Sequence, residues 1–273
     1  MIISISHSQM REEKWLLEAV LNCPPSELIP LVSQRPPVIS IVGGGGKTTC
    51  VKAIATECYD KGIRAAVATT THMQMPHDEF LLDAEDMDAF YALMEREGQV
   101  WLGRRLDPGA AGRESRMVKN KSRALSLDFV RRVCREGGVP VIIEADGARC
   151  LPCKAPADHE PVIPEETTHV LSVYGLDALG QRIADIAFRP ELVSDILGKE
   201  PADLIGEDDL VSLALSDRAG RKAVTDAMAY CVVLNKADND AMRDQAKEIA
   251  AKMTAQGVSR VLITNDLVRL MHR

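Results

Sequence analysis

One glycine-rich segment of the chain, Gly43–Thr49, has the composition of a phosphate-binding loop. Glycines leave backbone N–H groups unobstructed, so a loop made of them can surround phosphate oxygens. Lys47 would neutralise the β- and γ-phosphates of a nucleotide, and the Thr48 hydroxyl would ligate Mg²⁺. The residues expected to bind a nucleotide here are Gly43, Gly44, Gly45, Gly46, Lys47, Thr48 and Thr49.

The segment departs at one position from the common pattern G-x-x-x-x-G-K-[ST]. The first glycine of that pattern falls on position 41, which is Ile41 in this chain. The loop is therefore either a tighter variant that begins at Gly43 or one whose first position is apolar. In both cases we expect the amides of Gly45 and Gly46 to cradle phosphate.

Two acidic residues, Glu144 and Asp146, follow a short apolar run at 139–143. A P-loop enzyme needs such an acid at the end of a neighbouring strand to hold Mg²⁺. Because the two acids are two residues apart on an extended chain, both can face the same edge, and the spacing leaves open which one binds the metal. Among the hydroxyls of Thr69–Thr71, Thr71 would complete the metal shell, unless these threonines only end a strand.

A third motif, Asn235-Lys236-Ala-Asp238, follows an apolar run late in the chain. N-K-x-D at a strand end is typical of guanine recognition. Asp238 would accept hydrogen bonds from two nitrogens of guanine, which adenine does not offer. Asn235 would brace the loop and the base edge, and the stem of Lys236 would cover the ring. The sequence thus favours GTP over ATP.

A pair of thiols, Cys150 and Cys153, lies a few residues beyond Asp146, with His159 downstream. Such a set would bind a soft metal or handle a sulfur or selenium species. A complete zinc site requires four ligands, and the chain has no second C-x-x-C. Two incidental thiols are the alternative reading.

A proline-bracketed segment contributes Lys154, His159 and Glu160, which we expect to line an effector or substrate pocket. Arg189, which precedes a proline, would act as an arginine finger supplied in cis. A surface salt bridge is the alternative for Arg189. The predicted catalytic residues are Lys47, Glu144, Asp146 and Arg189.

The elements that must position these residues alternate in type along the chain. Short apolar runs rich in β-branched residues predict strands, and apolar residues at helical spacing predict helices. Strand, glycine loop, helix and strand in succession predict a parallel sheet with right-handed crossovers. Strands are predicted at 38–42, 63–70, 139–143, 168–173, 231–234 and 261–264, and helices at 11–21, 51–58, 127–134 and 242–253.

The predicted fold class is α/β, with a doubly wound, mostly parallel sheet of the P-loop NTPase type. Residues 1–37 are expected to form an N-terminal helix and linker, and 38–273 the P-loop domain. The segments at about 75–125 and 176–225 are too long to be simple connections. We expect them to be mostly helical insertions near the active edge.

The composition excludes several classes of protein. The net charge is −7 and aromatic residues make up only 4% of the 273 residues, which disfavours nucleic-acid binding. No apolar run is long enough to span a bilayer, and the residues at the start of the sequence lead us to expect no secretory signal there. Seven scattered cysteines suit a reduced compartment, so we expect a cytoplasmic protein.

Taken together, these motifs resemble those of the YqeC-like selenium-dependent hydroxylase accessory proteins. The resemblance spans about residues 38–240, and its most specific part is Ala157-Asp-His-Glu-Pro-Val-Ile-Pro164. It implies a role in the maturation of a selenium-dependent molybdenum hydroxylase, with that client enzyme as a partner. The matching segments are 42–49, 69–73, 144–147, 154–164, 188–191 and 233–238.

The motifs and the resemblance together predict a Mg²⁺-dependent nucleotide hydrolase that acts as an accessory factor, with GTP the favoured substrate. A small-molecule kinase or ligase using ATP or GTP is one alternative, since the γ-phosphoryl group could pass to an acceptor. A nucleotide-binding scaffold without hydrolysis is another. A homodimer is compatible with all three.

Overall fold

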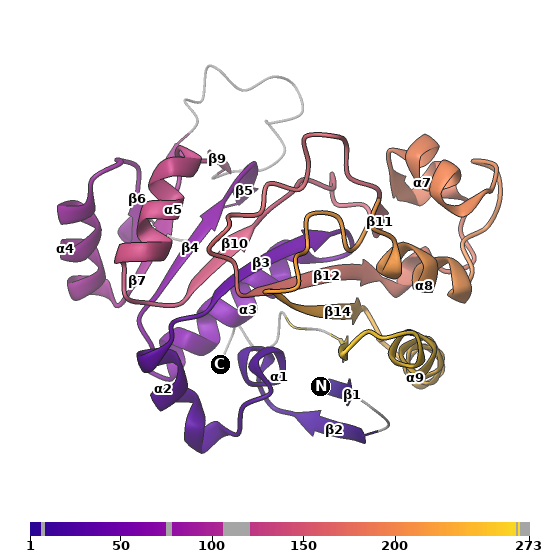
Figure 1. The fold of residues 1–273 in the computed structure, drawn as a ribbon, viewed down its shortest axis with the longest axis horizontal. Helices are drawn as coiled ribbons and strands as arrows, with labels where there is room; N and C mark the ends of the chain where they lie inside the picture. Colours follow the sequence, from indigo (N-terminus) through magenta and orange to yellow (C-terminus); the bar gives the residue numbers. More distant parts are fainter. Residues whose placement is uncertain (7–8, 75–77, 106–120, 266, 268–273) are drawn as a thin grey trace.

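Strands from both ends of the chain form one large sheet in the computed structural model (Figure 1). The structure describes residues 1–6, 9–74, 78–105, 121–265 and 267. Within this part, neighbouring strands are parallel except at one edge, where the strand Ile2–Ser6 runs antiparallel to both of its neighbours. In spatial order the strands are β2 (Gln9–Glu13), β1 (Ile2–Ser6), β15 (Arg260–Thr264), β14 (Ala229–Asn235), β12 (His169–Gly175), β3 (Val38–Gly43), β10 (Val141–Glu144), β4 (Ala65–Thr69), β7 (Gln99–Leu102) and β6 (Leu81–Leu82).

The central strand β3 shows why both faces of the sheet are covered. Ile39 and Ile41 point to one face and Val38 and Val42 to the other, and all four are buried. A strand that is apolar on both faces is typical of a parallel sheet enclosed between two helical layers.

Helices pack on both faces, which confirms the predicted doubly wound α/β class. The glycine loop joins β3 directly to the helix that follows it, as expected for the P-loop type. No helix in the described ranges has the length and apolar content to cross a membrane. One layer contains α1 (Leu16–Leu21), α2 (Pro25–Gln34) and α3 (Lys47–Asp60), and the other contains α4 (Met87–Glu97), α5 (Leu127–Glu136), α6 (Ile183–Ile186), α7 (Pro190–Leu197), α8 (Glu207–Leu215) and α9 (Asp240–Ala255).

Two small sheets and the short 3₁₀ turns η1 and η3 accompany the main sheet in the part of the chain that the structure describes. The parallel pair β11–β13 ties the segment after Asp146 to the residues that precede α7. The other small sheet is antiparallel and lies outside the main sheet. These elements are β11 (Cys153–Lys154), β13 (Ala187–Phe188), β5 (His72–Gln74), β9 (Lys121–Arg123), β8 (Arg104–Arg105), η1 (Asp78–Phe80) and η3 (Leu176–Ala178).

The prediction of a helix and linker for residues 1–37 is wrong for its first part, and the predicted linker contains the helix α2. Residues 2–6 and 9–13 form two strands of the main sheet, and the first helix begins only at Leu16. The apolar run at 2–5 buries its side chains by pairing with β15 from the far end of the chain. Such a pairing depends on distant residues, so local periodicity does not reveal it.

The segment at 75–125 also differs from the prediction of a mostly helical insertion. Its described residues contain one α-helix, α4, but also β7 and β6, which extend the main sheet at its edge. Residues 75–77 and 106–120 lie outside the described part. The segment 176–225 contains α6, α7 and α8, but these helices cover fewer than half of its residues, and Figure 1 shows α7 and α8 near β11 and β12.

Candidate functional site

The loops that carry the predicted motifs all leave the same edge of the sheet. β3, β10, β4, β12 and β14 are parallel neighbours, so their carboxyl-terminal ends lie side by side. In open α/β sheets, ligands bind in the crevice outside these ends. The site is therefore built from the residues that follow these strands.

The glycine loop begins at Gly43. Ile41 is fully buried inside β3, and the strand extends to Gly43. Gly43 and Gly45 have φ of +95° and +72°. A Cβ on Gly43 would lie 2.4 Å from the Val173 carbonyl oxygen, and one on Gly45 would lie 2.1 Å from the Gly175 nitrogen. Only glycine fits the close approach of this loop to β12.

The amides of the loop fall into two groups. Gly43, Gly44 and Gly45 donate hydrogen bonds to Asp146 Oδ2, the Val173 carbonyl and the Leu151 carbonyl, respectively. The N–H groups of residues 46–49 have no acceptor in the part of the chain that the structure describes. They open α3, where the helix dipole favours an anion. The expected phosphate cradle therefore starts at Gly46, because the Gly45 amide is already bonded.

Lys47 is folded back onto the loop. Its side chain is only 4% exposed, and Nζ lies 2.5 Å from the Gly43 carbonyl oxygen and 3.2 Å from Asp146 Oδ1. Oδ1 of Asp146 accepts no hydrogen bond from a described residue, so its contact with Lys47 is electrostatic. The loop lysine is thus held by a counter-ion inside the site.

Glu144 and Asp146 have different partners although they are two residues apart. Glu144 accepts a hydrogen bond from the Thr48 hydroxyl at 2.8 Å, whereas Asp146 contacts Lys47. Burial raises the pKa of Glu144, and the opposing effects of Lys47 and the Thr48 hydrogen bond are smaller. Thr48 and Glu144 together present oxygen atoms, which are the ligands that Mg²⁺ prefers.

The threonines after β4 lie beside this pair. Thr69 is buried, and its hydroxyl donates to the Glu144 carbonyl at 3.2 Å. The Thr71 amide in turn donates to the Thr69 hydroxyl, and the two hydroxyls are 3.4 Å apart. Thr71, expected near the metal, is therefore held by Thr69 at the end of β4, and it reaches the backbone of Glu144 through Thr69.

Asp146 also begins a chain of ion pairs that leads away from the loop. Lys154 Nζ lies 3.0 Å from Asp146 and 2.8 Å from Glu160, and Arg189 lies 2.7 Å from the same Glu160 oxygen. Burial raises the pKa of Glu160, but hydrogen bonds from Arg189 and Lys154 outweigh this effect and lower the pKa to about 2. Arg189 also lies over the ring of Phe188. Arg189, expected to act as an arginine finger, is thus engaged by Glu160.

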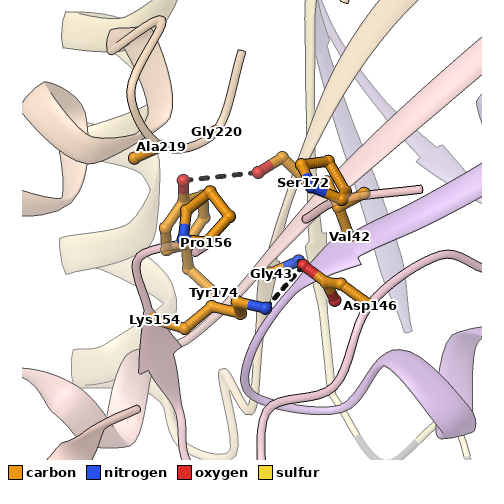
Figure 2. A pocket seen from close by; sticks show the side chains of 10 residues that line it. Val42, Gly43, Asp146, Lys154, Pro156, Ser172, Tyr174, Ala219 and Gly220 are labelled. Carbon is orange, nitrogen blue, oxygen red and sulfur yellow. Dashed lines mark hydrogen bonds and ion pairs between the residues drawn. The ribbon is translucent and has the colours of Figure 1, made fainter. Parts of the chain in front are cut away.

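The predicted effector pocket is closed in this structure. Lys154 and Glu160 are brought together, but the Lys154 side chain is 1% exposed, and His159 is exposed to solvent. Figure 2 shows Lys154 and Asp146 pointing toward one another in a cavity beside Gly43 and Tyr174. The cavity volume is about 10 Å³, the space of a single water molecule.

The thiol pair is not assembled into a metal site. Cys153 is fully buried in β11, where burial raises the pKa of its thiol to about 12, and Cys150 is exposed. In the described ranges no three His, Cys, Asp or Glu side chains are grouped to hold a metal ion, so Cys150, Cys153 and His159 form no such group. The arrangement agrees with two incidental thiols.

The Asn235–Asp238 motif follows β14 and contacts the glycine loop directly. Asn235 donates from Nδ2 to the Gly45 carbonyl at 2.8 Å and accepts from the Thr264 hydroxyl at 2.9 Å. Lys236 has a φ of +68°, and its Nζ lies 2.5 Å from Asp177. Asp238 is exposed and has no ion pair with any residue that the structure describes. Asn235 thus braces the loop, and the Asp238 carboxylate is free to accept hydrogen bonds.

Sequence reasoning missed the residues that hold the loop from outside the motifs. The carbonyls of Leu151 and Val173 accept its amides, and Lys154 reaches Asp146 from eight residues along the chain. No local pattern signals backbone acceptors. Lys154 was predicted to line an effector pocket, and a segment of the family resemblance begins at this residue, but its ion pair with Asp146 was not predicted.

Comparisons with known proteins identify one family. A sequence model of the YqeC protein family matches residues 39–191. A curated relative described as "Uncharacterized protein YqeC", from Escherichia coli strain K12, is 30% identical over 206 residues, which cover 70% of this chain and 72% of the relative. Among solved structures, chloroplast FtsY from Physcomitrella patens is 16% identical with a TM-score of 0.38, and the match covers 81% of this chain and 56% of FtsY.

Proposed function

The chain belongs to the YqeC family, and we propose that this member binds a nucleotide together with Mg²⁺ and hydrolyses it, with GTP as the preferred substrate. One observation carries the proposal. Three kinds of group lie together at the glycine loop: the N–H groups at the start of α3 without an acceptor among the described residues, the Lys47 ammonium, and the oxygen atoms of Thr48 and Glu144. These are the donors, the cation and the metal ligands that a nucleoside triphosphate requires.

The start of α3 supports binding of the phosphates. Four successive N–H groups, from Gly46 to Thr49, lack an acceptor among the described residues, and the helix dipole adds positive potential at the same point. Lys47 supplies a full positive charge once its Nζ turns from the Gly43 carbonyl to the phosphates. The glycine loop therefore offers both hydrogen bonds and charge to an anion.

The Thr48–Glu144 pair supports binding of the metal. A hydroxyl and a carboxylate fit Mg²⁺, which takes oxygen ligands and usually retains several waters. Bound Mg²⁺ would neutralise charge that develops on the phosphate oxygens during transfer. Because Asp146 is occupied by two lysines, we assign the metal to Glu144 rather than to Asp146.

The free carboxylate of Asp238 supports a preference for guanine. It follows Asn235, which braces the loop, so a base bound beside the loop would meet Asp238. Two nitrogen donors on guanine match one carboxylate, and adenine offers no such pair.

We also propose that the protein acts in the cytoplasm as an accessory factor in the maturation of a selenium-dependent molybdenum hydroxylase. The support is the resemblance of segment 154–164 to the accessory proteins named above. The contact of Lys154 with Asp146 links this segment to the glycine loop, so the nucleotide state would alter it. A client enzyme would recognise the altered conformation of this segment at the protein surface.

Phosphate release from GTP tests the hydrolase proposal. We expect release that requires Mg²⁺ and falls at least about 100-fold in Lys47→Ala and in Thr48→Ala. Thr254→Ala is the matched control, since Thr254 bonds its own helix at the far end of α9. Phosphate release that is unaffected by both loop substitutions would refute the proposal, whereas tight binding without release would favour the scaffold.

A further inference from the structure

Asp146 lies between two buried lysines. Lys47 approaches Oδ1 at 3.2 Å and Lys154 approaches Oδ2 at 3.0 Å, and all three side chains are at most 4% exposed. The same Oδ2 accepts the Gly43 amide at 3.2 Å, so Asp146 also holds the first residue of the glycine loop. Two cations therefore share one carboxylate inside the site.

The two lysines differ in what else holds them. Lys47 has one further contact, the Gly43 carbonyl, which belongs to the loop itself. Lys154 is fixed by the Gly147 carbonyl at 2.7 Å and by Glu160 at 2.8 Å, and it lies 5.6 Å from the centre of the Phe188 ring. Lys47 is thus the lysine that can leave Asp146, and Lys154 is the one that stays.

We propose that Lys154 is a positioning residue for nucleotide binding, because it keeps Asp146 paired when Lys47 turns to the phosphates. This inference rests on the proposed function of the loop. Without Lys47, the chain of charges consists of Asp146 and Glu160 against Lys154 and Arg189. Two carboxylates then face two cations, so within this chain of ion pairs the departure of Lys47 leaves no buried charge uncompensated.

The balance explains why a residue that does not touch the phosphates affects their binding. Without Lys154, Lys47 would be the only described cation that contacts Asp146. Moving Lys47 to a phosphate would then leave the buried Asp146 carboxylate without a cation. An unpaired buried charge is costly, so Lys47 would remain on Asp146. Removing Lys154 therefore weakens nucleotide binding through Asp146 alone.

The test is a double-substitution cycle read by the dissociation constant of a fluorescent GTP analogue with Mg²⁺. We expect Lys154→Gln to weaken binding at least about tenfold, and the same change on an Asp146→Asn background to alter it less than about threefold. Lys222→Gln is the matched control, because Lys222 pins the same segment through the carbonyls of Ala157 and Asp158 without touching Asp146. It should bind like the wild type.

A second variant has the opposite expected sign and serves if Lys154→Gln does not fold. Glu160→Gln leaves Lys154 with Asp146 as its only carboxylate, so Lys47 is freed and affinity should equal or exceed that of the wild type. A tenfold loss in Glu160→Gln would overturn the inference.

The outcomes separate the inference from the function on which it rests. If the wild type binds the analogue and Lys154→Gln binds it equally well, the inference alone fails. If Lys154→Gln weakens binding as much on the Asp146→Asn background as on the wild type, Lys154 has only a structural role. If the wild type binds no Mg²⁺–nucleotide, the proposed function and the inference fail together.

Discussion

Asn235 connects three parts of the site through one amide side chain. It bonds the Gly45 carbonyl on one side and Thr264 at the end of β15 on the other, and a Cβ on Gly46 would lie 2.3 Å from its Nδ2. In this position it supports the loop that surrounds the phosphates, which are common to all nucleoside triphosphates. Its contribution should therefore be independent of the base.

We predict that Asn235→Ala lowers affinity for GTP and ATP by the same factor, on the order of tenfold, because a buried hydrogen bond to the loop is lost. Parallel calorimetric titrations with both nucleotides measure this. A loss confined to GTP would show instead that Asn235 contacts the base.

Glu57 is a buried acid that takes no part in the nucleotide site. It accepts the Leu17 amide at 2.6 Å, which satisfies one donor at the start of α1, and its other oxygen has no partner among the described residues. Burial raises the pKa of Glu57 to about 8, which outweighs the lowering by the Leu17 hydrogen bond. Since an unfolded glutamate titrates near its ordinary value, the folded state binds the proton more tightly.

This shift predicts that Glu57 makes the protein less stable as pH rises. Its contribution is complete below about pH 4.5 and is lost as the pH rises to about 8, a change of a few kcal/mol in the free energy of unfolding. Glu57→Gln keeps the acceptor but cannot ionise. Urea unfolding measures the free energy of unfolding of both proteins. The value for the wild type minus that for the variant should decrease as the pH rises from 5 to 8, and a constant difference would rule out the titration.

At the scale of residues, the sequence predicts which residues form the site better than it predicts the contacts that each of them makes. Lys47, Thr48, Glu144 and Asp146 meet as expected, because each follows or opens an element at the same sheet edge. Glu144 pairs with Thr48 whereas Asp146 contacts Lys47 and Lys154, and no spacing along the chain encodes this division.

At the scale of elements, the glycine loop is held by its closeness to β12. Gly45 and Gly62 both have a positive φ, of +72° and +66°, but a Cβ on Gly45 would meet the Gly175 backbone at 2.1 Å, whereas Gly62 has open space. Comparing alanine substitutions at these two glycines therefore separates the free-energy cost of a positive φ from the cost of the steric contact with β12.

We predict that Gly62→Ala lowers the free energy of unfolding by about 1 kcal/mol, the cost of a left-handed residue. Gly45→Ala should lower it by at least about 2 kcal/mol more, because two backbone segments must separate. Urea-unfolding midpoints measure both changes. Equal losses would mean that the loop does not depend on its contact with β12.

Strands were predicted from the sequence where an apolar run was flanked by glycine or proline, as at Val38–Gly43 and Val141–Glu144. They were missed where pairing with a distant strand was required. The strands β1, β7 and β6 extend the two edges of the predicted sheet, and each is stabilised there by pairing with a strand that local periodicity does not reveal.

At the scale of the whole molecule, the parallel order of the strands brings the motifs together. Segments that start at positions 43, 144 and 235 meet because β3, β10 and β14 all end at one edge, and this could be predicted from the alternation of strands and helices. The closed state of the site could not, because it depends on Lys47 and on the segment 147–161 folding over the loop.

The most direct test of nucleotide recognition is a calorimetric titration of the wild type and of Asp238→Ala with GTP and with ATP, each with Mg²⁺. We predict that GTP binds at least about tenfold more tightly to the wild type, about 1.4 kcal/mol, and that Asp238→Ala removes this preference. Asp240→Ala, an exposed carboxylate two residues later, should keep it. Equal binding of ATP would contradict guanine recognition, and no saturable binding of either nucleotide would contradict the whole account of the site.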